Sequence, residues 1–170
     1  MSAKNTVTKG LTLIFSLGIC LLVGSLVSYQ SLPGAVAWYT NPQLLKAAFS
    51  LPLDVITWIW LASFVLMGLT LYVIIRTGIR KNDVAPGFLF FAFQILLLAG
   101  WSYSLFYMQS VFLAFIAIIA AWTAILCAII QIFRFSVIGG MPLIPCFLWV
   151  CYLVYFTYGI MVLNNLLFKI

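Results

Sequence analysis

The chain has 170 residues, of which 66% are hydrophobic and only 6% are charged, and its formal net charge at pH 7 is +6. A soluble domain of this size needs more polar surface than that, so the composition excludes a soluble globular protein and indicates an integral membrane protein. The positive charge does not indicate nucleic-acid binding, because the few basic residues mark the ends of apolar segments instead.

The charged residues divide the chain into apolar intervals. A spanning helix needs about 20 apolar residues, and three of the four long intervals fit one span each. The remaining interval is about twice as long and is broken by the polar stretch Met108-Gln109-Ser110, so it fits two. The sequence therefore predicts one all-α domain over residues 1–170, an integral membrane bundle of five transmembrane helices at about 10–30, 53–76, 86–107, 111–133 and 141–168.

The helix predicted for 10–30 carries small residues at four-residue spacing, which places them in one stripe that lets a neighbouring backbone approach closely. The stripe consists of Thr12, Ser16, Cys20, Gly24 and Ser28. Packing within the chain and a homodimer are both open uses for it. We expect Pro33-Gly34 to end the helix. The alternative for this run is a signal peptide, but its apolar segment is longer than the usual core and no A-x-A-like site follows.

The segment from Trp38 to Asp54 is predicted to be a long loop, and it leads into the helix predicted for 53–76. We interpret this loop as a lid over an apolar cavity. Trp58 fits the aromatic belt at the membrane interface. Trp60 lies deeper, because a rise of about 1.5 Å per residue puts it roughly 10 Å inside the membrane. Its indole N–H needs a partner at that depth.

The later helices add a second small stripe and a second deep indole. Ala117, Ala121, Ala124 and Ala128 form the stripe in the helix predicted for 111–133. Gly139-Gly140 and Pro142 are expected to punctuate the connection to the last helix. By the same rise per residue, Trp149 in that helix lies roughly 12 Å inside the opposite membrane face.

The basic residues also predict an orientation. Threading five spans puts six basic residues on the side of the N-terminus and two on the other, so the positive-inside rule places the N-terminus in the cytoplasm. The expected host is a bacterial cytoplasmic membrane, with the mitochondrial outer membrane as the alternative.

The residue inventory limits the chemistry. The chain has no His, and its only carboxylates, Asp54 and Asp83, lie at predicted membrane edges. A His and carboxylate metal site, a catalytic triad and a carboxylate dyad are therefore unavailable. The four cysteines contain no C-x-x-C pair. We predict no conventional enzyme, no metal and no required cofactor.

Several motifs in this order resemble one known family. Trp38-Tyr39 is similar to its Trp-Tyr pair in the first loop. Trp60 to Gly68 is similar to W-x-x-L-Y-x-x-M-G, with Phe64 in place of Tyr. Pro145 to Trp149 is similar to P-Y-x-x-W, and Leu163-Asn164 to the L-N that closes the last helix. Together with Gln94, Trp101 and Phe106 in the third helix, they identify the chain as a divergent member of the TspO/MBR family of tryptophan-rich sensory proteins and translocator proteins.

The resemblance implies five transmembrane helices and a ligand cavity between them. Members bind tetrapyrroles such as protoporphyrin IX, and some bacterial members are implicated in light-dependent porphyrin breakdown through a Trp pair that corresponds to Trp60 and Trp149. The residues expected to line the ligand site are Tyr39, Trp60, Phe64, Trp101, Trp149 and Leu153. Sterol recognition is not expected, because Tyr158 stands too far from Lys169 for the family's cholesterol motif.

The chain departs from the family pattern at several of its polar positions. The first loop lacks most of the family's Pro and Trp residues. Leu98 stands in place of the third-helix Asn, Cys146 in place of the Tyr after Pro145, and Phe156-Thr157 in place of the first L-N of the last helix. The leading hypothesis is a membrane protein that binds a tetrapyrrole for sensing, trafficking or handling. The alternatives are a structural or regulatory subunit that packs through its small-residue stripes, and a light-dependent porphyrin-degrading protein.

Overall fold

The structure is a computed structural model that describes residues 3–39, 41, 45 and 50–164, with the backbone alone at 3–6, 30–32, 38 and 39. Every regular element in this part of the chain is a helix. In chain order the elements are α1 (Ala3–Tyr39), α2 (Leu53–Thr77), α3 (Ala85–Ser102), the π-helical turn η1 (Tyr103–Tyr107), α4 (Val111–Phe135), α5 (Val137–Gly140) and α6 (Leu143–Leu163).

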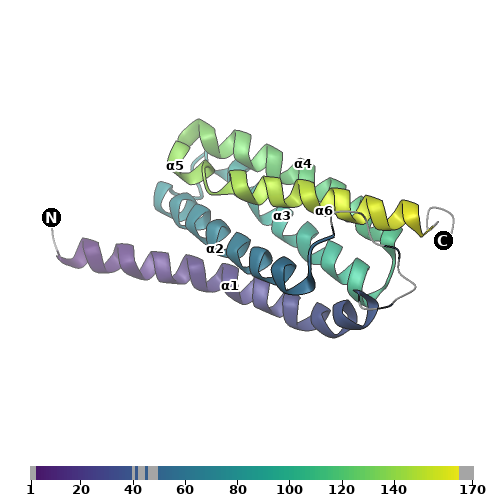
Figure 1. The fold of residues 1–170 in the computed structure, drawn as a ribbon. Helices are drawn as coiled ribbons and strands as arrows, with labels where there is room; N and C mark the ends of the chain where they lie inside the picture. The colour runs from purple at the N-terminus through teal and green to yellow at the C-terminus, as the bar shows by residue number, and fades with distance from the viewer. Residues whose placement is uncertain (1–2, 40, 42–44, 46–49, 165–170) are drawn as a thin grey trace.

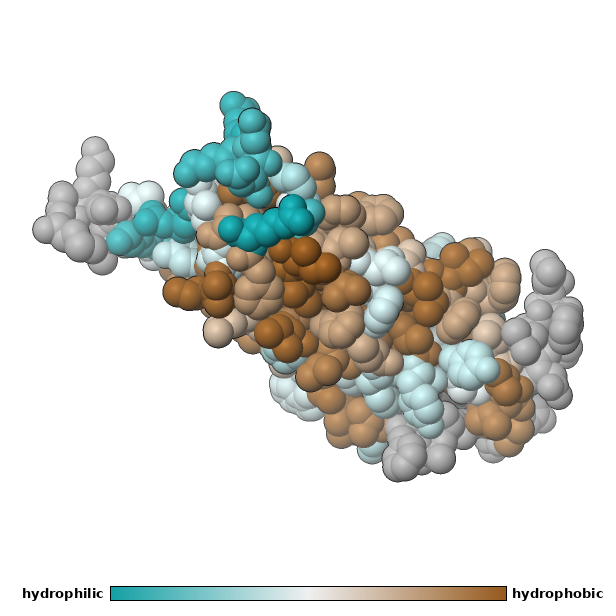
Figure 2. Space-filling model, turned by 90° about the horizontal axis from the view of Figure 1, so that it is seen from above, coloured by the Kyte–Doolittle hydropathy of each residue, from teal (hydrophilic) through white to brown (hydrophobic). Residues whose placement is uncertain are grey.

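Five stretches of the described residues are long and apolar enough to cross a membrane, and each overlaps one of the five predicted spans. The long helices run along a common direction, and α1 begins at the end of the bundle opposite to the one where α6 finishes (Figure 1). Hydrophilic residues gather at the end where α1 begins, and the surface beyond them is mostly hydrophobic (Figure 2). The predicted all-α membrane bundle is therefore confirmed.

The predicted end of the first helix is wrong. Pro33 lies inside α1, which continues to Tyr39. A proline removes one backbone hydrogen bond from a helix, whereas unwinding the chain in an apolar medium would leave several backbone groups without partners. Gly34 also lies against η1, because a Cβ at this position would collide with the carbonyl oxygen of Phe106. The close approach of η1 holds this part of α1 in place.

The third span ends in a π-helical turn, and a left-handed residue after it reverses the chain. The Met108 N–H donates to the Tyr103 carbonyl at 3.1 Å, a π-helical spacing that the sequence did not predict. Gln109 then adopts a left-handed conformation with φ of +53°. The polar break at residues 108–110 thus makes the predicted turn between α3 and α4.

The last span also differs from its predicted range of 141–168. It is preceded by the short helix α5, which contains the two glycines expected in a connection, and α6 ends at Leu163. A Cβ on Gly139 would lie 2.8 Å from Val73 Cγ1, and the Gly139 carbonyl accepts a hydrogen bond from the Thr70 hydroxyl at 3.0 Å. Gly139 therefore allows α5 to pack closely on α2, and Gly140 faces the Phe133 ring of α4. Residues 165–168 of the prediction lie outside the described part of the chain.

Both small-residue stripes pack within the chain. Ser16, Cys20 and Gly24 are buried, and a Cβ on Gly24 would lie 2.6 Å from the Phe64 ring on α2. In α4, Ala121 and Ala128 are fully buried. The stripe on α1 therefore packs against α2, and the stripe on α4 is buried within the bundle.

Candidate functional site

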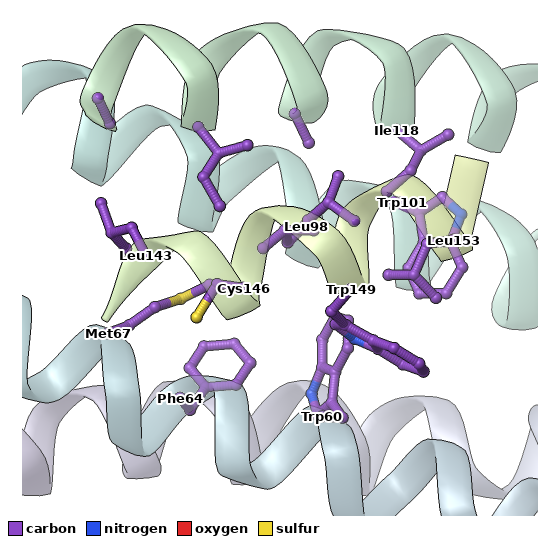
Figure 3. Close-up of a cluster of buried hydrophobic side chains, with 14 of the residues drawn as sticks. Trp60, Phe64, Met67, Leu98, Trp101, Ile118, Leu143, Cys146, Trp149 and Leu153 are labelled. Carbon is purple, nitrogen blue, oxygen red and sulfur yellow. The ribbon is translucent and has the colours of Figure 1, made fainter. Parts of the chain in front are cut away.

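The candidate site begins with an aromatic cluster in the interior between α2, α3 and α6. The predicted residues Trp60, Phe64, Trp101, Trp149 and Leu153 each have an exposed fraction of 7% or less. They extend from different helices into the same region, as Figure 3 shows. The side chain of the sixth predicted residue, Tyr39, lies outside the described residues.

Ring contacts connect α2, α3 and η1 through this cluster. The centroid of Trp60 lies 5.4 Å from that of Phe64 and 5.8 Å from that of Trp101, in tilted arrangements. Trp101 in turn meets Phe106 edge-on at 5.8 Å. Offset and edge-to-face pairs at these distances are the favoured aromatic geometries, so Trp60 and Trp101 form a preorganised wall.

A small cavity opens beside this wall. It has a volume of about 120 Å³, and Trp60 and Trp101 contribute to its lining. The other lining residues come from α1, α2 and the end of α3 with η1, and they are Ser28, Tyr29, Ala35, Leu53, Ile56, Thr57, Ser102 and Phe106. Phe64, Trp149 and Leu153 are buried near it but do not line it.

Trp149 contributes a polar group to the interior. Its ring stacks on Tyr152 at a centroid distance of 5.0 Å and an angle of 18°. Its Nε1 atom is buried and has no hydrogen-bond partner among the described residues. A buried N–H normally has a partner, so one without protein partners is suited to an acceptor on a bound molecule or to water.

The indole of Trp101 is satisfied differently. Its Nε1 donates to the Thr157 hydroxyl at 3.0 Å, and that hydroxyl donates to the Leu153 carbonyl at 2.8 Å. Thr157 stands where the family pattern has an Asn, and the sequence analysis treated it only as a departure. Trp101 and Thr157 stand on two separate apolar helices, and no local sequence pattern indicated that their side chains would form a hydrogen bond.

Gln94 is a second polar residue whose place in the interior the sequence did not reveal. It is fully buried on α3, and neither its Oε1 nor its Nε2 atom has a partner in the described part of the chain. Leu98 and Trp101 lie one and two turns further along the same helix face. The amide therefore adds hydrogen-bonding capacity to an interior that is otherwise apolar.

Two described residues of the segment after α1 form hydrogen bonds to the α6 region. The Leu51 N–H donates to the Tyr152 hydroxyl at 3.0 Å. The Leu45 N–H donates to the Asn164 Oδ1 atom at 3.0 Å, and Asn164 Nδ2 donates back to the Leu45 carbonyl at 2.9 Å. Two side chains of the α6 region thus hold the described parts of the loop.

Comparison with known proteins identifies the family to which this architecture belongs. The model of the TspO/MBR family matches residues 16–163. The chain belongs to the TspO/MBR family. It is also similar to the tryptophan-rich protein TspO of Chlorobaculum tepidum, with 33% identity over 154 residues that cover 91% of this chain and 96% of that protein.

The chain's departures from the TspO/MBR pattern fall inside the bundle. Phe64, Leu98 and Cys146, which replace a Tyr, an Asn and a Tyr, are all buried. The Cys146 thiol points toward the Ser63 carbonyl on α2 at 3.6 Å and toward the Pro142 carbonyl at 3.3 Å. The interior of this member therefore has fewer strong hydrogen-bonding groups than the family pattern provides.

Proposed function

We propose that the chain binds a flat hydrophobic ligand, a tetrapyrrole such as protoporphyrin IX, among the aromatic side chains of α2, α3 and α6, and that it senses, traffics or handles this ligand. The observation that carries the proposal is the buried, unpartnered indole N–H of Trp149 in the same interior as the Trp60 and Trp101 wall. Stacking and apolar burial would supply most of the affinity, and the indole would supply a directed polar contact.

The size of the cavity adds a requirement to this proposal. Pockets for small molecules typically measure about 300–1,000 Å³, and the cavity beside Trp60 measures about 120 Å³. Ligand binding therefore requires the interior to widen. The loop contacts at Tyr152 and Asn164 lie at half-buried or exposed positions. Hydrogen bonds there contribute about 1 kcal/mol each, so breaking the contacts of Leu51 and Leu45 has a modest cost.

A fluorescence titration with protoporphyrin IX tests the proposal. The purified protein is titrated while intrinsic tryptophan emission is recorded. Saturable quenching is expected, and Trp60→Phe and Trp149→Phe are each expected to weaken binding roughly 2- to 10-fold, the equivalent of about 0.5–1.5 kcal/mol of aromatic interaction.

The matched control is Trp58→Phe. Trp58 lies two residues from Trp60 on α2 but is 72% exposed and points away from the interior. Its replacement removes one fluorophore and should leave the affinity unchanged. Absence of saturable quenching would contradict the proposed ligand, and equal affinity in all four proteins would contradict the proposed site. Illumination of the same complex, with and without both interior Trp residues, tests light-dependent degradation through loss of porphyrin absorbance.

The subunit alternative has no separate observation in its favour. It rested on the small-residue stripes of the first and fourth predicted helices. Both stripes are used for contacts between helices of this chain, as the positions of Gly24 and Ala121 show.

A further inference from the structure

The first helix separates from the rest of the bundle toward its N-terminal end (Figure 1). It packs closely on α2 as far as Leu17, whose Cα would lie 3.0 Å from a Cβ on Gly68. Before that contact, its large apolar side chains are open to the surroundings: Leu11, Ile14 and Phe15 are each at least 60% exposed. A space lies between α1, α2 and α3 on both sides of this contact, from Phe15 to Val23 of α1.

That space is an apolar groove of about 460 Å³. Its lining residues come from all three helices and from the turn after α2, and they are Phe15, Ile19, Cys20, Val23, Leu71, Ile75, Ile79, Phe88, Phe91, Ala92, Ile95 and Leu96. A second apolar hollow of about 530 Å³ shares Phe15 and Ile75 with it and extends along α1 to Leu11. The two hollows lie within the membrane-spanning segments and are separate from the cavity beside Trp60.

Cations directly follow two residues that line the groove. Ile75 and Ile79 line it, and the residues that follow them are Arg76 and Arg80, with Lys81 next. All three cationic side chains are exposed. No carboxylate in the described part of the chain forms an ion pair with any of them. Charge and apolar surface therefore meet at this point, with the cations at the level where a membrane's polar headgroups lie.

The backbone fixes two of these cations in a tight turn. Gly78 has φ of +106°, and a Cβ there would lie 3.4 Å from the Lys81 side chain. The Lys81 N–H donates to the Gly78 carbonyl at 3.1 Å. Arg80 and Lys81 are exposed in this turn, directly after the groove-lining Ile79. Asp83 is the acidic residue at this end, and it follows them in the sequence.

We propose that this groove binds an anionic phospholipid. Its two acyl chains would occupy the two adjoining hollows, and its phosphodiester would contact Arg76, Arg80 and Lys81. Guanidinium groups bind phosphate oxygens through paired hydrogen bonds. A headgroup with net negative charge is favoured over a zwitterionic one, because the positive group of the latter would be held beside three cations.

A second copy of the chain fits the groove less well. A protein partner at this place must provide negative charge as well as apolar surface, or the cations are left uncompensated. The chain contains only two carboxylates. Asp54 lies at the start of α2, at the opposite end of the helix from Arg76, and Asp83 lies within the basic turn itself. The lipid therefore complements the charge of the groove, and a second copy does not.

Lipid titration of the full-length protein tests this site. The protein in detergent is titrated with phosphatidylglycerol and, separately, with phosphatidylcholine of the same acyl chains, and native mass spectrometry counts the bound lipids. One phosphatidylglycerol is expected to bind in preference. R80Q and K81Q should each weaken that binding about fivefold while leaving phosphatidylcholine binding unchanged.

Two further variants make the result specific to the groove. Arg134 is an exposed cation at the C-terminal end of α4, a helix that contributes no lining residue to either hollow, so R134Q should bind phosphatidylglycerol as the parent protein does. Ala92→Trp fills the groove from α3 and should abolish the preferred binding without touching a cation. Equal retention of both lipids, an R134Q loss as large as that of R80Q, or a dimer that excludes lipid in the mass spectra would each overturn the proposal.

Discussion

The buried indoles of Trp101 and Trp149 have opposite hydrogen-bonding states. The N–H of Trp101 is fixed by Thr157, which is itself fully buried. The N–H of Trp149 has no such partner, although its ring is held against Tyr152. An unsatisfied donor in an apolar interior is unfavourable. The Trp101 indole is therefore assigned a structural role, and the Trp149 N–H is the one of the two that has no acceptor among the described residues.

The Thr157 contact gives a stability prediction. Thr157→Val keeps the shape of the side chain but removes the acceptor for the Trp101 indole. The variant is expected to lower the free energy of unfolding by about 1–2 kcal/mol, because a buried donor loses its partner. Thermal unfolding in detergent measures the change.

The control for this prediction is Thr123→Val. Thr123 is exposed on α4, and its hydroxyl bonds only to carbonyls of its own helix at Ile119 and Ala120. It should change stability by no more than about 0.5 kcal/mol. If both variants unfold alike, the Trp101 to Thr157 bond does not stabilise the bundle.

At the scale of elements, glycines decide how closely the first two helices approach. Gly24 on α1 faces the Phe64 ring, and Gly68 on α2 faces the backbone of Ser16 and Leu17. The two contacts are in register along an antiparallel pair, as small-residue interfaces between membrane helices commonly are. The contact at Gly24 also presses α1 against the aromatic cluster, so the packing of α1 on α2 helps to shape the site.

A single added methyl group tests this packing. Gly68→Ala would place a Cβ 3.0 Å from Leu17 Cα and 3.3 Å from the Ser16 carbonyl oxygen, and both are backbone atoms that cannot move alone. We expect a loss of about 1–3 kcal/mol of stability, measured by thermal unfolding. Gly18→Ala is the control, since nothing lies within 4 Å of a Cβ there. Equal unfolding temperatures for the two variants would contradict the close contact.

At the scale of the whole molecule, hydrogen bonds link the segment after α1 to the α6 region. The hydroxyl of Tyr152 accepts from the Leu51 backbone, and the amide of Asn164 bridges to Leu45. Tyr152 lies within α6, and Asn164 is the residue that directly follows this helix. The helix that provides Trp149 to the interior therefore also bonds to Leu51, through the Tyr152 side chain that stacks on Trp149.

Removing the hydrogen bond between Tyr152 and Leu51 should change the rate of ligand entry. Tyr152→Phe keeps the ring that stacks on Trp149 and removes only the hydroxyl. If opening of the loop limits entry, association of protoporphyrin IX is expected to become up to about fivefold faster, because about 1 kcal/mol of closure is lost. Stopped-flow quenching of tryptophan fluorescence measures the rate.

Tyr155→Phe is the matched control for that experiment. Tyr155 lies on the same helix, but its side chain is 43% exposed and bonds to no described loop residue. It should leave the association rate unchanged. An unaltered rate in Tyr152→Phe would show that ligand enters by another route.

The sequence predicted the five spans because charge and hydropathy are local properties that a membrane imposes on each segment. It did not predict that α1 would pass through Pro33 or that Gly139 would lie in a helix. In both places a neighbouring segment, η1 or α2, packs so closely that it overrides the local signal. The π-helical turn at Tyr103 depends in the same way on contacts outside its own segment.

The aromatic positions were also predictable from the sequence. Trp60, Trp101 and Trp149 match a family pattern, and the rise of a helix gives the depths of Trp60 and Trp149. The hydrogen-bonding state of each indole could not be predicted from the sequence. Whether a buried indole meets a hydroxyl is decided by the rotation and tilt of helices that lie far apart in the sequence. The sequence by itself therefore determined the membrane class, the number of spans and the residues that enter the interior. Only the tertiary structure decided which of those residues are already satisfied by the protein, because hydrogen bonds between helices depend on relative positions that no local pattern encodes.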